Sequence, residues 1–266
     1  MGTVIAVANQ KGGVGKTTTC ISIAAALAER KKRVLLIDMD PQGNSTSGLG
    51  IDKKSLRCTT YDLLVGNVSG IEQVILQTRA KLDLLPANIN LVGAEVELIQ
   101  MAKREKRLFN TLSAVRDQYD FLVIDSPPSL GLLTVNALTA ADAVLIPVQA
   151  EYYALEGLMQ LMTTIGLVRK SSNPDLRLAG VFITMFDSRT QLSKQVRDEV
   201  AWYFQKDFLR TVIPRNVRLS EAPSHGTTIF EYDKRSKGAN SYRNLVQELL
   251  DRLGSQPWMN GTLGQI

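Results

Sequence analysis

The run Lys11-Gly-Gly-Val-Gly-Lys-Thr17, near the start of the chain, combines glycines, lysines and a hydroxyl at close spacing. Gly12, Gly13 and Gly15 can adopt backbone conformations closed to other residues, which lets backbone N–H groups approach a phosphate. A helical pattern follows directly, and the positive end of its dipole would point at the same anion. The run therefore predicts a phosphate-binding loop.

Two side chains of this run add chemistry beyond anion binding. Lys16 is expected to reach the β- and γ-phosphates of a nucleotide, and the Thr17 hydroxyl is expected to ligate Mg²⁺. The usual pattern G-x-x-x-x-G-K-[ST] fails at one position, because Gln10 stands where the first glycine belongs. A second lysine, Lys11, follows it, so the loop is a variant of the usual one.

Acidic side chains follow two apolar runs further along the chain. Asp38 and Asp40 come after residues 34–37, and Asp125 comes after residues 121–124. In an open parallel sheet, ligands bind at the carboxyl edge, where such strands end. Asp125 fits the carboxylate that holds Mg²⁺ through a water molecule, because Mg²⁺ keeps several of its waters. Asp40 is the candidate to orient the water molecule that attacks the γ-phosphate.

Short apolar runs alternate with stretches of helical periodicity, which is typical of a mostly parallel sheet with helices on both faces. Strands are expected at residues 3–8, 34–37, 82–86, 119–125, 143–148, 178–185 and 209–213, and helices at 20–28, 90–118, 155–170, 191–205 and 242–253. Residues 45–80 are mixed and polar and are expected to form short helices and loops, whose bounds the sequence does not indicate. We predict an α/β, doubly wound, P-loop NTPase-like fold, with residues 1–254 as a single domain and 255–266 as a flexible tail.

The composition argues against several other classes of protein. No apolar run approaches the roughly 18 residues of a membrane span, and no export leader precedes the first strand, so a cytoplasmic protein is expected. Cys20 and Cys58 are too few for a disulfide framework, and His225 is the only histidine. The net charge is +5, and eleven Lys or Arg against seven Asp or Glu lie between residues 180 and 243. This basic segment fits either a solvated surface or the footprint of an anionic partner.

Several segments together resemble motifs of the ParA/MinD ATPase superfamily. Its deviant Walker A, switch and Walker B motifs resemble Lys11-Gly-Gly-Val-Gly-Lys-Thr-Thr18, Leu36-Ile-Asp-Met-Asp-Pro-Gln-Gly-Asn44 and Val123-Ile-Asp-Ser-Pro-Pro-Ser129. A fourth segment, residues 213–224, is similar to one in the chromosome- and plasmid-partition branch (ParA, Soj). The resemblance covers about residues 2–252, so it is far more specific than the phosphate loop alone.

The resemblance implies an ATPase with a slow basal rate that uses ATP and Mg²⁺. ATP binding would drive a sandwich homodimer, in which Lys11 reaches across to the phosphates of the partner subunit. The implied catalytic residues are Lys11, Lys16 and Asp40, and the implied Mg²⁺ site uses Thr17 and Asp125. The implied nucleotide contacts are Lys11, Gly12, Gly13, Val14, Gly15, Lys16, Thr17 and Thr18, with Pro214 and Asn216 beside the adenine. A lysine that acts in trans would couple hydrolysis to assembly.

The resemblance also implies that the dimer binds double-stranded DNA without sequence preference. Arg189 and Arg218 match the positions at which the family binds DNA, and both lie in the basic segment. Contacts to phosphates would make this binding salt-dependent. A ParB/Spo0J-like centromere-binding protein is the implied partner that stimulates hydrolysis. The implied localisation is cytoplasmic, on the nucleoid.

Two alternatives share the phosphate loop. A MinD-like, membrane-associated regulator of division-site placement would end in a basic amphipathic helix, whereas residues 256–266 contain no Lys or Arg. An ATP-dependent metal-cluster protein would need cysteine thiolates at a subunit interface, and Cys20 and Cys58 do not match those positions. The sequence therefore favours the partition ATPase, with no membrane partner.

Overall fold

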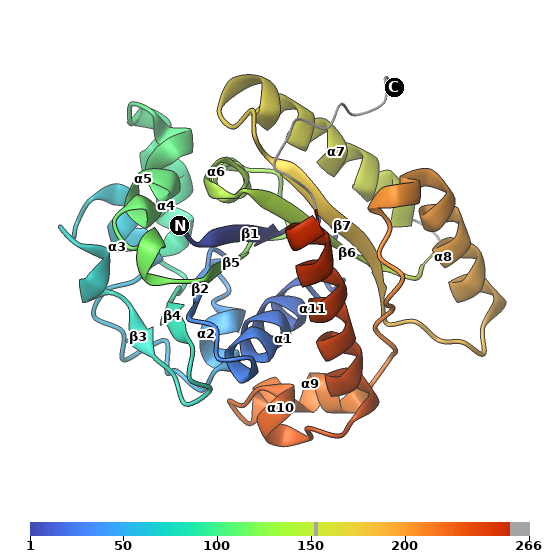
Figure 1. Ribbon diagram of the computed structural model, residues 1–266. Coiled ribbons are helices and arrows are strands. Elements are labelled where there is room, and N and C mark those ends of the chain that lie inside the picture. Colours follow the sequence, from blue (N-terminus) through green and yellow to red (C-terminus); the bar gives the residue numbers. More distant parts are fainter. Residues whose placement is uncertain (152–153, 256–266) are drawn as a thin grey trace.

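The computed structural model describes residues 1–151 and 154–255, and this part of the chain contains one seven-stranded sheet with helices on both faces (Figure 1). The strands are β1 (Thr3–Val7), β2 (Val34–Asp38), β3 (Leu76–Gln77), β4 (Asp83–Leu85), β5 (Phe121–Asp125), β6 (Ala143–Gln149) and β7 (Arg177–Thr184). Their order is β3-β4-β2-β5-β1-β6-β7, and the short β3 pairs with β4 in the antiparallel direction while the other pairs are parallel. The predicted doubly wound, mostly parallel α/β sheet is confirmed.

The two faces of the sheet are covered by different helices (Figure 1). One face packs against α1 (Lys16–Glu29), α9 (Val217–Ser224), α10 (Ile229–Tyr232) and α11 (Lys237–Ser255), and the other against α3 (Thr60–Val65), α4 (Leu91–Glu97), α5 (Arg107–Ser113), α6 (Leu132–Ala140), α7 (Ala154–Ser171) and α8 (Gln191–Phe204). In β1, Val4 and Ala6 lie in one core, and Ile5 and Val7 lie in the other. Strands buried on both faces need no polar alternation, which explains the continuous apolar runs of the sequence.

The single helix predicted for residues 90–118 is wrong. After α4, the chain forms the 3₁₀ turn η2 (Leu98–Gln100), and α5 lies between two more, η3 (Arg104–Lys106) and η4 (Arg116–Gln118). Lys103 adopts a left-handed conformation with φ 52°, so the helical hydrogen bonds cannot continue through it. Asn136 of α6 holds the break in place, because its side chain donates to the carbonyl of Arg104 and accepts the N–H of Leu108. A tertiary contact has overridden the local helical pattern.

The strand predicted at residues 209–213 is also wrong. Leu209 donates to the carbonyl of Val181 and Ile213 donates to that of Ile183, both at 2.8 Å. Between these two bonds the segment advances four residues while β7 advances two, so no regular ladder can form. The N–H groups at positions 210 and 211 are accepted by Glu248 of α11 instead of by β7. The segment is a strap along the edge of β7.

The carboxyl ends of three strands meet at one edge of the sheet. In the register of the parallel pairs, Asp125 lies opposite Val7 on one side and opposite Asp38 on the other. The loop that follows β1 therefore lies beside both acids, as predicted for the ligand-binding edge.

Candidate functional site

The loop between β1 and α1 is held by hydrogen bonds to β6 and β7. Asn9 Nδ2 donates to the carbonyl of Pro147 at 2.7 Å, and Asn9 Oδ1 accepts the N–H of Lys11 at 3.0 Å. Thr184, the last residue of β7, donates from its hydroxyl to the carbonyl of Val14 at 2.8 Å. The shape of the loop is thus fixed by two neighbouring strands.

The loop leads directly into the N-terminus of α1. Gly15 is the residue before the helix and has φ 88°, a conformation that glycine adopts without strain. The helix begins at Lys16, four residues earlier than the apolar periodicity predicted. The first backbone N–H groups of a helix have no partner within it and carry the positive end of its dipole. The loop and the helix start are therefore suited to bind a phosphate.

Lys16 lies inside the site rather than on its surface. The residue is 6% exposed, and its Nζ donates to the carbonyl of Lys11 at 2.9 Å. Burial lowers the pKa of its ammonium group, and the nearby carboxylates of Asp125 and Asp40 act in the opposite direction. One lysine and two acids from three separate segments are thus electrostatic neighbours.

Asp38 and Asp125 are fully buried side by side. Asp38 Oδ2 accepts the N–H and the hydroxyl of Thr46 at 2.9 and 2.7 Å, and Asp125 Oδ2 accepts the hydroxyl of Ser45 at 2.8 Å. Burial raises the pKa of Asp38 to about 7, and the neighbouring Asp125 charge adds to this. Burial also raises the pKa of Asp125 to about 6, while the hydroxyls of Ser45 and Thr17 act against it.

The residues around Asp125 fit a magnesium ion that arrives with phosphate. Asp125 Oδ1 is buried without a hydrogen-bond partner, and the Thr17 hydroxyl is close enough to lower the pKa of this carboxyl. Mg²⁺ is typically held by one or two protein oxygens together with waters and phosphate oxygens. In the described residues, no group of three or more His, Cys, Asp or Glu could hold a metal ion.

Asp40 lies in the turn that follows β2. Its Oδ1 accepts the N–H of Gln42 at 2.9 Å, and its carbonyl accepts the N–H of Gly43 at 2.8 Å. Gly43 has φ 60° and precedes the short helix α2 (Asn44–Gly48). A Cβ at this glycine would lie 2.6 Å from the carbonyl oxygen of Ala87, so the turn requires glycine. Ser45 and Thr46 of α2 contact the buried acids, and no local pattern in the sequence singles out these two residues.

Lys11 forms an ion pair outside this group of acids. Its Nζ lies 2.7 Å from Glu151 Oε2, and Gln149 Nε2 donates to the other oxygen of the same carboxylate. The side chains of Lys11 and Glu151 are 38% and 46% exposed, so the pair contributes at most about 1 kcal/mol to stability. The sequence did not single out Glu151, which reaches Lys11 because β6 pairs with β1.

The segment expected beside the adenine leads from the end of β7 into α9. Pro214 forms a bridge with Phe186 just beyond β7, and the Asn216 side chain caps α9 by accepting a backbone N–H at 2.9 Å. A small hollow lies between Thr18 of α1 and Pro223 of α9. Contact of Pro214 and Asn216 with the adenine stays a prediction.

The two arginines expected to bind DNA are exposed and paired with acids of their own chain. Arg189 donates to both oxygens of Asp187, at 2.9 and 2.7 Å, and these bonds hold the pKa of that carboxyl well below its usual range. Arg218 NH1 lies 2.9 Å from Glu221, and its Nε lies 3.9 Å from Asp233. Neither arginine lies with the phosphate-loop residues.

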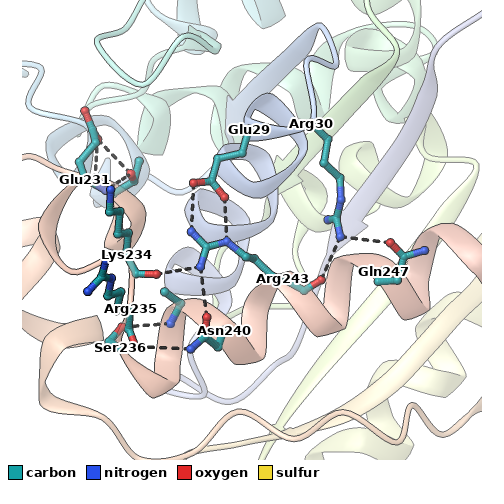
Figure 2. Close-up of polar contacts among 11 residues, drawn as sticks. Glu29, Arg30, Glu231, Lys234, Arg235, Ser236, Asn240, Arg243 and Gln247 are labelled. Atoms are coloured by element: carbon teal, nitrogen blue, oxygen red, sulfur yellow. Dashed lines mark hydrogen bonds and ion pairs between the residues drawn. The ribbon is translucent and has the colours of Figure 1, made fainter.

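Further cations lie where α1 ends against α11 (Figure 2). Arg243 donates to both oxygens of Glu29 at 3.0 and 3.1 Å and to the carbonyl of Lys234 at 2.7 Å, and Arg30 donates to the carbonyl of Arg243. These two arginines fasten the helices together. Lys234 and Arg235 are exposed, and neither side chain forms an ion pair within the described part of the chain. They follow Asp233 directly, so they lie near Arg218.

The chain matches one family profile and is similar in sequence to known proteins along most of its length. A family profile described as "AAA domain" matches residues 2–178. The chain is 56% identical over 249 residues to the sporulation initiation inhibitor protein Soj of Bacillus subtilis, covering 94% of this chain and 98% of that one. It is 52% identical over 253 residues to the chromosome partitioning protein ParA of Myxococcus xanthus, covering 95% and 89%.

A solved structure agrees with the fold and with the expected ligands. The cobyrinic acid a,c-diamide synthase of Mycobacterium smegmatis, with bound ADP and magnesium, is 41% identical, with a TM-score of 0.86 over 99% of this chain and 100% of that one. The same protein has also been solved with an ATP analogue and magnesium. A nucleotide and magnesium therefore bind to a relative that shares this architecture.

Proposed function

This chain belongs to the ParA/Soj family of chromosome-partitioning ATPases, and we propose that it is an ATP-dependent DNA-partition switch. ATP binding drives a sandwich homodimer that binds double-stranded DNA of any sequence. A ParB/Spo0J-like centromere-binding partner stimulates the slow hydrolysis and so releases the DNA. The observation that carries the proposal is that the phosphate loop, Asp40 and Asp125 meet at one edge of the sheet. The Lys11 side chain does not point to these acids, because it forms an ion pair with Glu151.

In the proposed reaction, the loop N–H groups and Lys16 bind the β- and γ-phosphates and balance their charge. The Thr17 hydroxyl and the Asp125 carboxylate, the latter through water, would hold Mg²⁺, which would supply positive charge to balance that of the phosphates. Asp40 orients the attacking water molecule for an in-line approach. Lys11 of the partner subunit supplies the remaining positive charge. Because this lysine comes from the second chain, hydrolysis requires the dimer.

For DNA binding, we assign the phosphate contacts to Arg189 and Arg218. Their side chains are 85% and 54% exposed, so a phosphate can reach them by replacing the carboxylate that each one now contacts. Lys234 and Arg235 add positive charge near Arg218, because they directly follow Asp233, which lies 3.9 Å from Arg218 Nε. Contacts of this kind go to the DNA backbone, so the binding would be weakened by salt and insensitive to sequence.

The alternatives account for fewer of these observations. In the described part of the chain, no helix is long and apolar enough to cross a membrane. The basic terminal helix that a MinD-like protein would need concerns residues 256–266, which lie outside the described residues. For a metal-cluster protein, Cys20 is fully buried, and burial raises the pKa of its thiol well above the usual value, so it is a poor source of thiolate. The synthase name belongs to a solved relative at 41% identity, below the 56% and 52% of the partition proteins.

The test is DNA binding by gel shift with ATP, with ADP and without nucleotide. We expect DNA of any sequence to bind only with ATP, and this binding to persist in Asp40→Ala, which should hydrolyse slowly. Arg189→Glu should abolish the shift while a fluorescent ATP analogue still binds. The control is Lys103→Glu, which makes the same charge change at an exposed site outside the basic segment. The proposal would be contradicted if the DNA bound equally well with ATP, with ADP and without nucleotide, or if it bound in none of these three conditions.

A further inference from the structure

Helix α8 exposes two aromatic side chains near its C-terminal end. Trp202 is 76% exposed, more than any other Trp, Tyr or Phe in the described part of the chain, and Tyr203 beside it is 36% exposed. The Tyr203 ring packs on Phe204, which lies in the core, with 4.9 Å between the ring centroids. Large, rigid rings at the surface are typical of a site that another segment or molecule covers. We call Trp202 and Tyr203 the aromatic pair.

The C-terminal end of α11 lies beside the end of α8. Arg252 donates to the carbonyl of Ala179 at 3.0 Å and to that of Asp207 at 3.2 Å. Asp207 belongs to the 3₁₀ turn η5 (Gln205–Asp207), which follows α8 directly. Because a helix rises about 1.5 Å per residue, Trp202 lies only about 8 Å further back along α8. The described part of the chain therefore ends close to the aromatic pair.

The last eleven residues of the sequence, 256–266, have a composition that suits an aromatic surface. They contain no Asp, Glu, Lys or Arg, and they include the large apolar residues Trp258, Met259, Leu263 and Ile266. A segment of this length can span up to roughly 35 Å when it is extended. It is therefore long enough to reach from the end of α11 to the aromatic pair and to cover it. We call residues 256–266 the tail.

The charges around the aromatic pair balance one another. Arg197 forms an ion pair with Asp198 at 2.6 Å. Glu199 precedes Trp202 by three residues and Lys206 follows it by four, so one charge of each sign lies on the same side of the helix. A strongly acidic or strongly basic partner would find no opposite excess of charge here. An uncharged, apolar segment such as the tail is the occupant that these surroundings favour.

We propose that the tail packs over the aromatic pair of its own chain. Pro257 cannot continue the helical hydrogen bonds of α11, so the chain can turn toward α8 at this point. Trp258 and Met259 follow at once, and an indole ring and a thioether both pack favourably on aromatic rings. Because the tail is tethered nearby, it competes at high effective concentration against any separate molecule. The packing needs neither nucleotide nor a second chain, so it goes beyond the proposed function.

The first test uses tryptophan fluorescence, because Trp202 and Trp258 are the only tryptophans of the chain. In a full-length Trp258→Phe background, all tryptophan emission comes from Trp202. Adding Met259→Asp and Leu263→Asp should raise the acrylamide quenching constant of Trp202 at least about twofold, because two charged side chains would have to be buried against apolar rings for the tail to stay in place.

The control for the added charge is Gln256→Asp with Asn260→Asp in the same background. These substitutions also add two carboxylates to the tail but leave its apolar residues intact, so the quenching constant should stay unchanged. The Tm should be equal within about 2 °C in both variants, which shows that they are folded. If Trp202 is quenched equally in the background and in both variants, the tail does not cover the aromatic pair.

The second test reads the contact directly. In a Cys58→Ser background, which leaves only the buried Cys20, Glu199→Cys and Leu263→Cys should be joined within one chain by a short bifunctional maleimide, without nucleotide. Lys103→Cys, in the turn before α5, should not be joined to Leu263→Cys. Intact-mass spectrometry distinguishes a link within one chain from a link between two chains. A product that contains two chains would show that a second copy covers the aromatic pair, and this result or the absence of any link would overturn the proposal.

Discussion

Lys11 illustrates how a single charge can link the two states of the proposed switch. In this structure its Nζ is 2.7 Å from Glu151 Oε2, whereas the proposed dimer needs the same ammonium at a phosphate of the other subunit. The carboxylate and the phosphate would thus compete for one cation. Since the pair is half exposed, this competition is weak, and a bound phosphate can win it.

We therefore predict that Glu151→Gln strengthens the ATP-dependent dimer. The gain should be up to about thirtyfold in dissociation constant, because each of the two subunits loses a half-exposed ion pair that is worth at most about 1 kcal/mol. Light scattering in the Asp40→Ala background measures it, with Glu199→Gln, an exposed acid of α8, as the control. A weaker dimer would mean instead that Glu151 keeps its contact with Lys11 after assembly.

At the scale of elements, the strap along β7 connects the sheet edge to the segment of Pro214 and Asn216. The strap cannot pair regularly with β7, and two of its N–H groups would be left unpaired without Glu248 of α11. One carboxylate thus fastens the closing helix to the strap. The position of the segment expected beside the adenine depends on this side chain from α11.

Glu248→Ala should therefore destabilise the chain by about 1–3 kcal/mol, because it leaves two N–H groups without their charged acceptor. Urea unfolding of the nucleotide-free protein measures this change. Asp251→Ala on the same helix removes a carboxylate that bonds only to the exposed Gln247 side chain, and it should change stability by less than about 0.5 kcal/mol. Equal effects of the two variants would refute the role assigned to Glu248.

At the scale of the whole molecule, two buried acids set the pH dependence of folding. The pKa values of Asp38 and Asp125 are raised from 3.8 to about 7 and about 6 by burial, the first also by the second. Between the unfolded and folded values, the folded chain keeps protons that the unfolded chain has released. Stability contributed by these groups is therefore present at low pH and is lost as the pH rises to about 7.

We predict that the Tm of the nucleotide-free chain falls between about pH 4 and about pH 7. Asp38→Asn, which cannot ionise, should flatten this dependence, and ATP with Mg²⁺ should flatten it as well, because the proposed metal site uses the ionised Asp125. Differential scanning fluorimetry across this range is the measurement. A Tm that rises over the same range in the wild type and in Asp38→Asn alike would show that other groups dominate.

The elements that have a local and strongly periodic sequence pattern can be predicted from the sequence alone. The phosphate loop, the buried strands and the acids at their carboxyl ends follow from glycine geometry, apolar runs and strand-ending residues, which need no distant partner. The long helices α7, α8 and α11 were found for the same reason. The parallel α/β sheet followed from the alternation of these elements.

Other features of the fold and of the site depend on contacts between residues that lie far apart in the sequence, so they become visible only in the folded chain. Asn136 breaks the stretch predicted as one helix, and Glu248 supports a strap where a strand was predicted. The pairing of Lys11 with Glu151 spans 140 residues of sequence, and no local pattern marks it. The exposure of one apolar side of α4 is equally invisible in the sequence, since apolar residues at helical spacing indicate a buried side until the neighbouring elements are in place.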